Sequence, residues 1–313
     1  MANLTESVAT APPATNLAND DGPKIHRRKH PWTIVGAAVT LAVLGLLVYS
    51  LATNPNIGVE YIQQYLFDPM TIAGVGVTIF LTVASMVVGT AIAVVVAVMR
   101  LSSNPVLKGI ATLYVWLLRG TPLLIQLIFW AYLGALYDKI SLGIPFTSVT
   151  FWTVDTSSLI TPTIAALLAL TINQGAYAAE VIRAGIMSVD NGQTEAAMAL
   201  GMTSARTLRR IVLPQAMRTI IPPMGNETLS MLKATSLVSV IGGLDLLTNL
   251  QHAYAQNFQV IPLLIVGCIW YLFLTTVISI PQAWLEKRYG RGVQPIGGSR
   301  ASTFTRLFAI KGK

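Results

Sequence analysis

Six long apolar stretches dominate this sequence and leave few folds open to it. The first, residues 32–53, contains no charged side chain. A helix rises about 1.5 Å per residue, so a run of about 20 residues can cross a hydrocarbon core about 30 Å thick. We therefore expect an all-α integral membrane protein whose spans are residues 32–53, 71–99, 106–137, 160–181, 219–241 and 259–284.

The composition supports a membrane location. Only 11% of the 313 residues are charged and 53% are apolar, whereas a soluble domain carries about 25% charged residues. So few charges could not coat a soluble surface, which excludes a soluble enzyme and a disordered scaffold. The single cysteine, Cys268, lies inside an apolar run and cannot form an internal disulfide, which excludes a disulfide-stapled secreted domain.

The distribution of lysine and arginine predicts the orientation of the spans. Eighteen of the 21 basic residues lie before the first span, in two alternate connections and at the end of the chain. Because cytoplasmic loops carry an excess of Lys and Arg, six spans with both termini cytoplasmic fit this pattern. The net charge of +8 is then explained by the orientation of the chain in the membrane, and it does not indicate nucleic-acid binding. The loops expected outside the cytoplasm, which hold only Lys139 between them, are residues 54–70, 138–159 and 242–258.

The two ends of the chain are polar. Residues 1–31 are rich in Pro, Ala and Asn and close with four basic residues, so we expect a flexible cytoplasmic tail. Residues 287–313 form a second basic cytoplasmic tail. A cleaved signal peptide is the alternative interpretation of residues 32–53, but this run is longer than the usual apolar segment of about 7–15 residues and starts late.

In the segment of residues 185–214, which we expect to be cytoplasmic, the sequence predicts two short helices with a glycine between them. Asp190 or Asn191 is suited to cap the first helix, and Gly201 to stop it. Thr203 or Ser204 can cap a second helix over residues 205–212, which we expect Pro214 to end. Considered alone, the segment could also be an amphipathic loop at the membrane surface.

The order of residues in this segment resembles the EAA loop of permease subunits in ABC importers. That motif combines an acidic residue and two alanines with a glycine and a more distant apolar–proline end. The matching positions are Glu195, Ala196, Ala197, Gly201, Ile211, Leu213 and Pro214.

Three further stretches resemble the polar amino acid permeases, the histidine/glutamine/arginine/opine group. They are residues 118–126, 177–185 and 232–237, with one departure at Ala234, where family members commonly carry an acidic or polar residue. The resemblance covers residues 70–286. It implies a type I permease core of five transmembrane helices, to which residues 32–53 add one N-terminal helix.

The resemblance implies a division of labour in a bacterial inner membrane. A separate ATPase dimer would dock on the EAA loop, a second similar or identical permease would complete the pore, and an extracytoplasmic binding protein would deliver an amino acid. The chain contains no G-x-x-x-x-G-K-[ST] phosphate loop. We therefore expect it to be no enzyme and to hold no cofactor, with ATP bound on the partner.

Charged residues inside apolar runs are candidates for the substrate path, because charge is costly in the membrane. A zwitterionic amino acid could place its ammonium on Glu227 or Glu180 and its carboxylate on Lys233 or Arg119. For each residue a structural ion pair or snorkelling to the interface is the alternative. For Arg119 the interfacial position is favoured. Thr121 as N-cap and Pro122 as first helical residue would break the span near the cytoplasmic face, which would place Arg119 among the lipid headgroups. Polar residues on the span of Glu180 could also line the path: Asn173, Gln174 and Tyr177.

Two other function classes, and one other cargo for the same class, can be weighed against this prediction. An ion-coupled secondary transporter of a small polar solute would explain the buried charges but would leave the EAA spacing accidental. A membrane-embedded enzyme is opposed because no Ser/His, paired-carboxylate or metal constellation supports it, and we predict no metal site. The third alternative is an ABC importer of another small metabolite.

Overall fold

The structure is a computed structural model, and it describes residues 31–143 and 150–289. The chain divides into two compact units, one up to Pro55 and one from Asn56 onward. The predicted tail at residues 1–31 lies outside the described residues except for Pro31, and so does the predicted basic tail beyond residue 289.

The first unit contains one helix, α1 (Pro31–Ala52), over the first predicted span. The side chains that are described along it are exposed, including Trp32, Leu41 and Tyr49. Among the side chains that are described, apolar ones are distributed around the helix and are not confined to one face, a pattern that suits contact with lipid.

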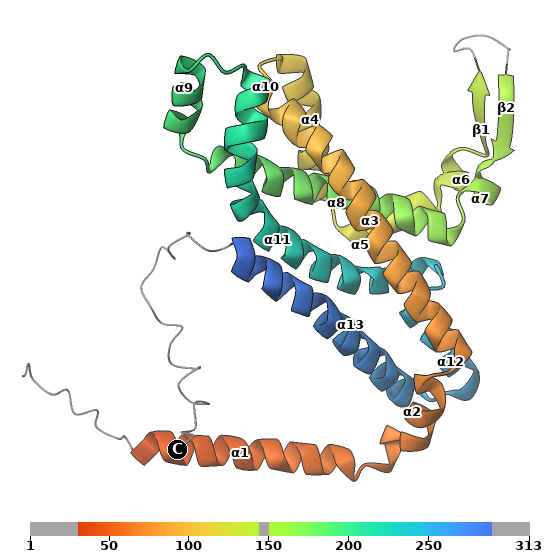
Figure 1. The fold of residues 1–313 in the computed structure, drawn as a ribbon. Coiled ribbons are helices and arrows are strands. Elements are labelled where there is room, and N and C mark those ends of the chain that lie inside the picture. The colour runs from red at the N-terminus through yellow and green to blue at the C-terminus, as the bar shows by residue number, and fades with distance from the viewer. Residues whose placement is uncertain (1–30, 144–149, 290–313) are drawn as a thin grey trace, which may run out of the picture. The chain divides into compact units, whose positions relative to one another are not determined.

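The second unit is a helical domain with one small hairpin (Figure 1). Short 3₁₀ segments lie at Pro55–Ile57 (η1) and Thr235–Ile241 (η3), and a π-helical segment lies at Leu208–Val212 (η2). The remaining elements are α2 (Val59–Leu66), α3 (Pro69–Leu101), α4 (Pro105–Gly120), α5 (Leu123–Ala131), α6 (Leu133–Leu136), β1 (Lys139–Gly143), β2 (Thr150–Asp155), α7 (Thr156–Leu159), α8 (Pro162–Met187), α9 (Asn191–Ala199), α10 (Ser204–Thr207), α11 (Leu213–Ala234), α12 (Leu246–Asn257) and α13 (Val260–Tyr289).

Three of these helices start in the same way, with a polar cap followed by proline. Asp68 Oδ1 accepts a hydrogen bond from the Met70 N–H before α3, and Asn104 and Thr161 cap α4 and α8. A proline at the first helical position costs no hydrogen bond, because that N–H has no partner within the helix. The three dipeptides fix where these helices begin.

The helices α3 and α8 make the most extensive contact in the domain and cross in Figure 1. Two glycines allow this approach. A Cβ at Gly89 in α3 would lie 2.8 Å from the Gln174 Cβ, and a Cβ at Gly175 in α8 would lie 2.8 Å from the Ile92 Cγ2. Small residues permit close helix packing where lipid provides no hydrophobic drive.

Three described helices, α3, α8 and α13, are individually long and apolar enough to span a membrane, and up to six spans result if each of three bent pairs counts as one. One such pair is α4 with α5, bent by 100°, where the sequence predicted an interrupted span. The core of α3 is small and polar in places, with Thr78, Thr82 and Ser85 buried, while its exterior is apolar.

Segments interpreted only as loops contain regular structure. Residues 54–70 include α2, and residues 242–258 include α12, which Asp245 caps through the Leu247 N–H. Residues 138–159 include the antiparallel pair β1–β2, with Ile140 opposite Val154. The strands are short and lie between long apolar runs, so the hydropathy pattern that located the spans did not resolve them.

Candidate functional site

A cavity of about 460 Å³ opens between the α4–α5 break, α8 and α11. This volume is in the range of small-molecule sites. The lining mixes charged, polar and apolar groups: Arg119, Gly120, Thr121, Pro122, Leu123, Asn173, Gln174, Tyr177, Glu227, Ser230, Met231 and Ala234. Five residues that the sequence suggested for the substrate path therefore line one cavity: Arg119, Asn173, Gln174, Tyr177 and Glu227.

The helix break forms one wall of this cavity. The helix α4 ends at Gly120 and α5 begins at Leu123, with Pro122 as its N-cap. The prediction that Thr121 would be the N-cap was wrong: its hydroxyl donates to the Leu117 carbonyl at 2.8 Å and so serves the end of α4. The proline ring has no N–H to continue α4, and this ends the helix.

Two buried side-chain amides satisfy the backbone at the break. Gln126 Nε2 donates to the carbonyls of Leu118 at 2.9 Å and Thr121 at 3.1 Å, and Asn173 Nδ2 donates to the same Leu118 carbonyl at 3.2 Å. Asn173 Nδ2 also donates to Gln126 Oε1 at 3.2 Å. Non-helical backbone at membrane depth is tolerated where such partners exist, so the break is a built feature of the domain.

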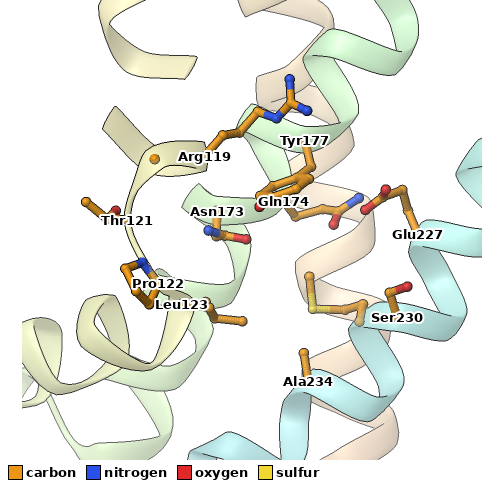
Figure 2. Close-up of a pocket in the computed structure, with 12 residues that line it drawn as sticks. Arg119, Thr121, Pro122, Leu123, Asn173, Gln174, Tyr177, Glu227, Ser230 and Ala234 are labelled. Atoms are coloured by element: carbon orange, nitrogen blue, oxygen red, sulfur yellow. The ribbon is translucent and has the colours of Figure 1, made fainter. Parts of the chain in front are cut away.

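Opposite charges stand at the two sides of the cavity. Figure 2 shows Arg119 reaching over Tyr177 from α4, and Glu227 pointing from α11 toward Gln174. The guanidinium carbon of Arg119 lies 5.2 Å from the centre of the Tyr177 ring, within cation–π range. The structure places the Arg119 side chain at the cavity, and its interfacial position in the membrane stays a prediction.

The remaining two path candidates lie elsewhere. The carboxylate of Glu180 accepts hydrogen bonds from Arg100 and Arg183 and forms an ion pair with each. Its pairing with Arg183 is the structural alternative that the sequence left open, and Arg100 is a partner that the sequence analysis missed. Lys233 is exposed in the last turn of α11, and the cavity lining does not include it.

Ser230 lines the cavity and was missed as a site candidate although a signal existed. Ser230 follows Glu227 by three positions, and residues three apart lie on one face of a helix. Met231 also lines the cavity, but nothing in the sequence separates it from other core residues.

The predicted coupling segment forms a capped helix followed by a glycine turn. Asp190 Oδ1 accepts from the Gly192 N–H at 2.7 Å, so Asp190 is the N-cap of α9. Gly201 has a φ of +77°. Its N–H donates to Met198 O at 2.9 Å, and the Met202 N–H donates to Ala197 O at 3.1 Å. These two bonds make a Schellman motif, as expected from Gly201.

The motif residues differ in exposure. Glu195, Ala196 and Gly201 are exposed on the segment, whereas Ala197 is buried. Leu200, between the helix and the glycine, is 84% exposed.

Pro214 does not end the second helix, so that prediction was wrong. The chain continues from α10 through η2 into α11, with Pro214 in its first turn and Pro222 and Pro223 inside it. Ile211 lies in η2 and Leu213 begins α11. The π-helical turn changes the hydrogen-bond register just before Pro214, so a residue without an N–H can enter the helix.

Comparison with known proteins supports one family. Residues 89–291 match the family described as "Binding-protein-dependent transport system inner membrane component". The chain is 42% identical to the arginine transport system permease protein ArgU of Corynebacterium glutamicum over 84% of this chain and 82% of the relative. It is 36% identical to the L-cystine transport system permease protein TcyB of Bacillus subtilis, over 75% of this chain and 92% of the relative.

Solved structures agree with this assignment. A structure described as an amino acid ABC transporter with histidines matches with a TM-score of 0.61 and 34% identity, over 73% of this chain and 98% of that chain. A MetNI methionine ABC transporter, at 16% identity and a TM-score of 0.53, shares the fold. The chain belongs to the family of inner membrane components of binding-protein-dependent transport systems.

Proposed function

We propose that this chain is the permease subunit of an ABC importer that moves a polar amino acid into the cytoplasm, and that the cavity at the α4–α5 break is its substrate site. The observation that carries this proposal is the placement of Arg119 and Glu227 at two sides of one cavity. An amino acid carries a carboxylate and an ammonium, and the two side chains offer a charge-assisted contact to each. Asn173, Gln174, Tyr177 and Ser230 add polar groups between them.

The names of the relatives suggest which class of substrate is transported. ArgU is named for arginine and TcyB for cystine, and another relative, NocM of Agrobacterium fabrum, is named for nopaline. All three substrates are amino acids or amino acid derivatives with polar side chains. We propose the same substrate class here, with L-arginine as the first compound to test.

In this proposal ATP binding on a separate ATPase dimer supplies the energy. The motif residues couple this chain to the ATPase: Glu195, Ala196, Ala197, Gly201, Ile211, Leu213 and Pro214. Of these, Glu195, Ala196 and Gly201 are exposed and available for direct contact. Because a ligand shifts an equilibrium only by its differential affinity for the two states, ATP binding favours one orientation of the spans through this segment. The chain itself carries no cofactor.

The proposed arrangement in the bacterial inner membrane has a five-helix core at residues 70–286 and α1 as an added span, with both termini cytoplasmic. A second permease, identical or similar, completes the transporter, and an extracytoplasmic binding protein delivers substrate. Lys233, exposed on α11, is a candidate for the path beyond the cavity. Glu180 is assigned to structure because two arginines already pair with it.

Binding to the purified permease–ATPase complex in nanodiscs tests the site without the selectivity of the binding protein. We expect the complex to bind one of L-arginine, L-histidine, L-glutamine or L-cystine. Both Arg119→Gln and Glu227→Gln should weaken that binding about tenfold or more, the typical loss for a hydrogen bond to a charged group.

Lys108→Gln is the matched control, since Lys108 is an exposed cation on α4 outside this cavity. Uptake in cells should follow the same order. Unchanged binding in both Arg119→Gln and Glu227→Gln, in complexes that assemble normally, would remove the cavity as the substrate site. A complex that transports amino acids without ATP would contradict the importer mechanism.

A further inference from the structure

The peptide group that joins Leu118 to Arg119 is held by two side chains from outside its helix. In an uninterrupted helix the Leu118 carbonyl would accept from the N–H of residue 122, but that residue is proline and has none. Gln126 Nε2 at 2.9 Å and Asn173 Nδ2 at 3.2 Å take the place of that donor. The backbone that carries Arg119 is therefore fixed by α5 on one side and by α8 on the other.

Gln126 is the centre of this network. Its Nε2 also donates to the Thr121 carbonyl at 3.1 Å and to Thr121 Oγ1 at 2.9 Å, and its Oε1 accepts from Asn173. Both amides are 8% exposed. A buried network with every member bonded is rigid and specifies one geometry. Gln126 does not itself line the cavity, so it can influence a ligand there only through the break.

The same helix holds the other end of Arg119. Tyr177 follows Asn173 by four positions in α8, which places both on one face. Asn173 bonds the backbone beside Arg119, and the Tyr177 ring lies under its guanidinium at 5.2 Å. Figure 2 shows Asn173 and Tyr177 on the side of α8 that faces the break. Arg119 is therefore held at both ends by neighbouring turns of α8.

We infer that Gln126 is a positioning residue for substrate recognition: it holds the Leu118–Arg119 peptide so that the guanidinium meets the substrate carboxylate. The inference rests on the proposed function, because it assigns Arg119 to the carboxylate of an amino acid. It distinguishes Gln126 from a residue that only stabilises the fold. A structural defect weakens all ligands alike, whereas a displaced Arg119 weakens only those that carry the carboxylate.

The test compares an amino acid with the amine that lacks its α-carboxylate, on the permease–ATPase complex in nanodiscs. The pair is L-arginine with agmatine, or L-histidine with histamine if histidine is the cargo. The variants are Gln126→Met, which removes all hydrogen-bond donors from a side chain of similar length, and Gln126→Glu. In both we expect the affinity for the amino acid to fall about threefold to tenfold. This loss should not exceed the loss in Arg119→Gln. Affinity for the amine should change less than about twofold, within the range of an uncoupled site.

Gln282→Met is the matched control, because Gln282 is also a bonded amide in this domain but lies outside the cavity. Equal losses for both ligands in the Gln126 variants, or no loss for either, would overturn the inference. If neither Gln126 variant assembles, Asn173→Ala, which removes one of the two donors to the Leu118 carbonyl, is tested in the same way. The quantity compared is the ratio of the affinity loss for the amino acid to the affinity loss for the amine. An unchanged ratio in Arg119→Gln would instead refute the carboxylate contact of the proposed function, so the two failures are distinguishable.

Discussion

The Glu180 carboxylate in α8 accepts a hydrogen bond from the Arg100 guanidinium in the last turn of α3, although the two residues are 80 positions apart. Arg183, one helical turn further along α8, binds the other carboxylate oxygen. The helix α8 ends at Met187, and the coupling segment follows at once. The Arg100–Glu180 ion pair therefore joins α3 to α8 close to the predicted coupling segment, while the Arg183–Glu180 pair lies within α8.

Glu180→Gln is expected to lower the thermal stability of the complex by an amount equivalent to about 1–3 kcal/mol, since it weakens two charge-assisted bonds and leaves Arg100 and Arg183 as neighbouring like charges. Thermal unfolding of the detergent-solubilised complex measures this. Arg100→Lys should cost less than Arg100→Met because one charge contact survives. Stability of Arg100→Met equal to that of Lys108→Met, an exposed cation on α4, would contradict the role of the pair.

The glycines at the α3–α8 crossing predict a second stability effect. Gly89→Ala would bring a Cβ within 2.8 Å of Gln174, and Gly175→Ala within 2.5 Å of the Tyr114 hydroxyl. Overpacking of this kind costs about 1–3 kcal/mol, so both variants should unfold at lower temperature. Gly76→Ala on α3 is the control, because no atom lies within 4 Å of its Cβ position. Equal melting temperatures for all three variants would show that the helices can move apart freely.

Where the helices begin and how they are capped can largely be predicted from neighbouring residues in the sequence. The dipeptides Asp68-Pro69, Asn104-Pro105 and Thr161-Pro162 begin three helices, and cap chemistry depends only on neighbours along the chain. The same holds for Asp190 and Gly201, whose bonds stay within α9 and its turn. The break after Arg119 was expected for the same reason, with its cap assigned one residue too early.

Contacts between distant segments could not be read in the same way. The contact between the Arg119 guanidinium and the Tyr177 ring could not be predicted, because no local rule connects these two residues. Arg100 was unconnected to Glu180 because the pairing depends on how α3 and α8 pack. Pro214 was taken as a helix end because the preference of proline was clear, whereas the π-helical turn that precedes it has no sequence signal that we could identify.

Gly201 allows its two expected roles to be separated. Its φ of +77° strains any residue with a Cβ, by about 1–2 kcal/mol for most residues, and asparagine tolerates this region better than others. Among the described residues, no atom lies within 4 Å of a Cβ placed at Gly201. If backbone conformation alone matters, Gly201→Asn should keep the ATPase bound and Gly201→Ala should weaken it slightly.

We expect a different pattern, because the exposed Gly201 belongs to the proposed docking surface. Gly201→Asn and Gly201→Arg should both reduce copurification of the ATPase, with the larger side chain having the larger effect. Quantitative mass spectrometry of the tagged permease measures the ratio of the two subunits. Met202, which is half-buried beside this turn, gives the control Met202→Leu. Full ATPase recovery with Gly201→Arg would exclude Gly201 from the docking surface.

The N-terminal helix should be dispensable for assembly. It belongs to a compact unit that ends at Pro55, and the family match begins only at residue 89. Arg100 and Lys108 follow α3, whereas Glu60 and Asp68 precede it, so the charge rule orients α3 without help from α1. A chain lacking residues 1–53 should therefore insert with its C-terminus cytoplasmic, retain the ATPase and transport substrate. A C-terminal reporter fusion, subunit copurification and uptake measure the three properties.

A second chain, in which a Leu/Ala helix of equal length replaces α1, shows whether any loss follows from the missing span or from its sequence. Loss of ATPase binding in both chains would make α1 part of the transporter core.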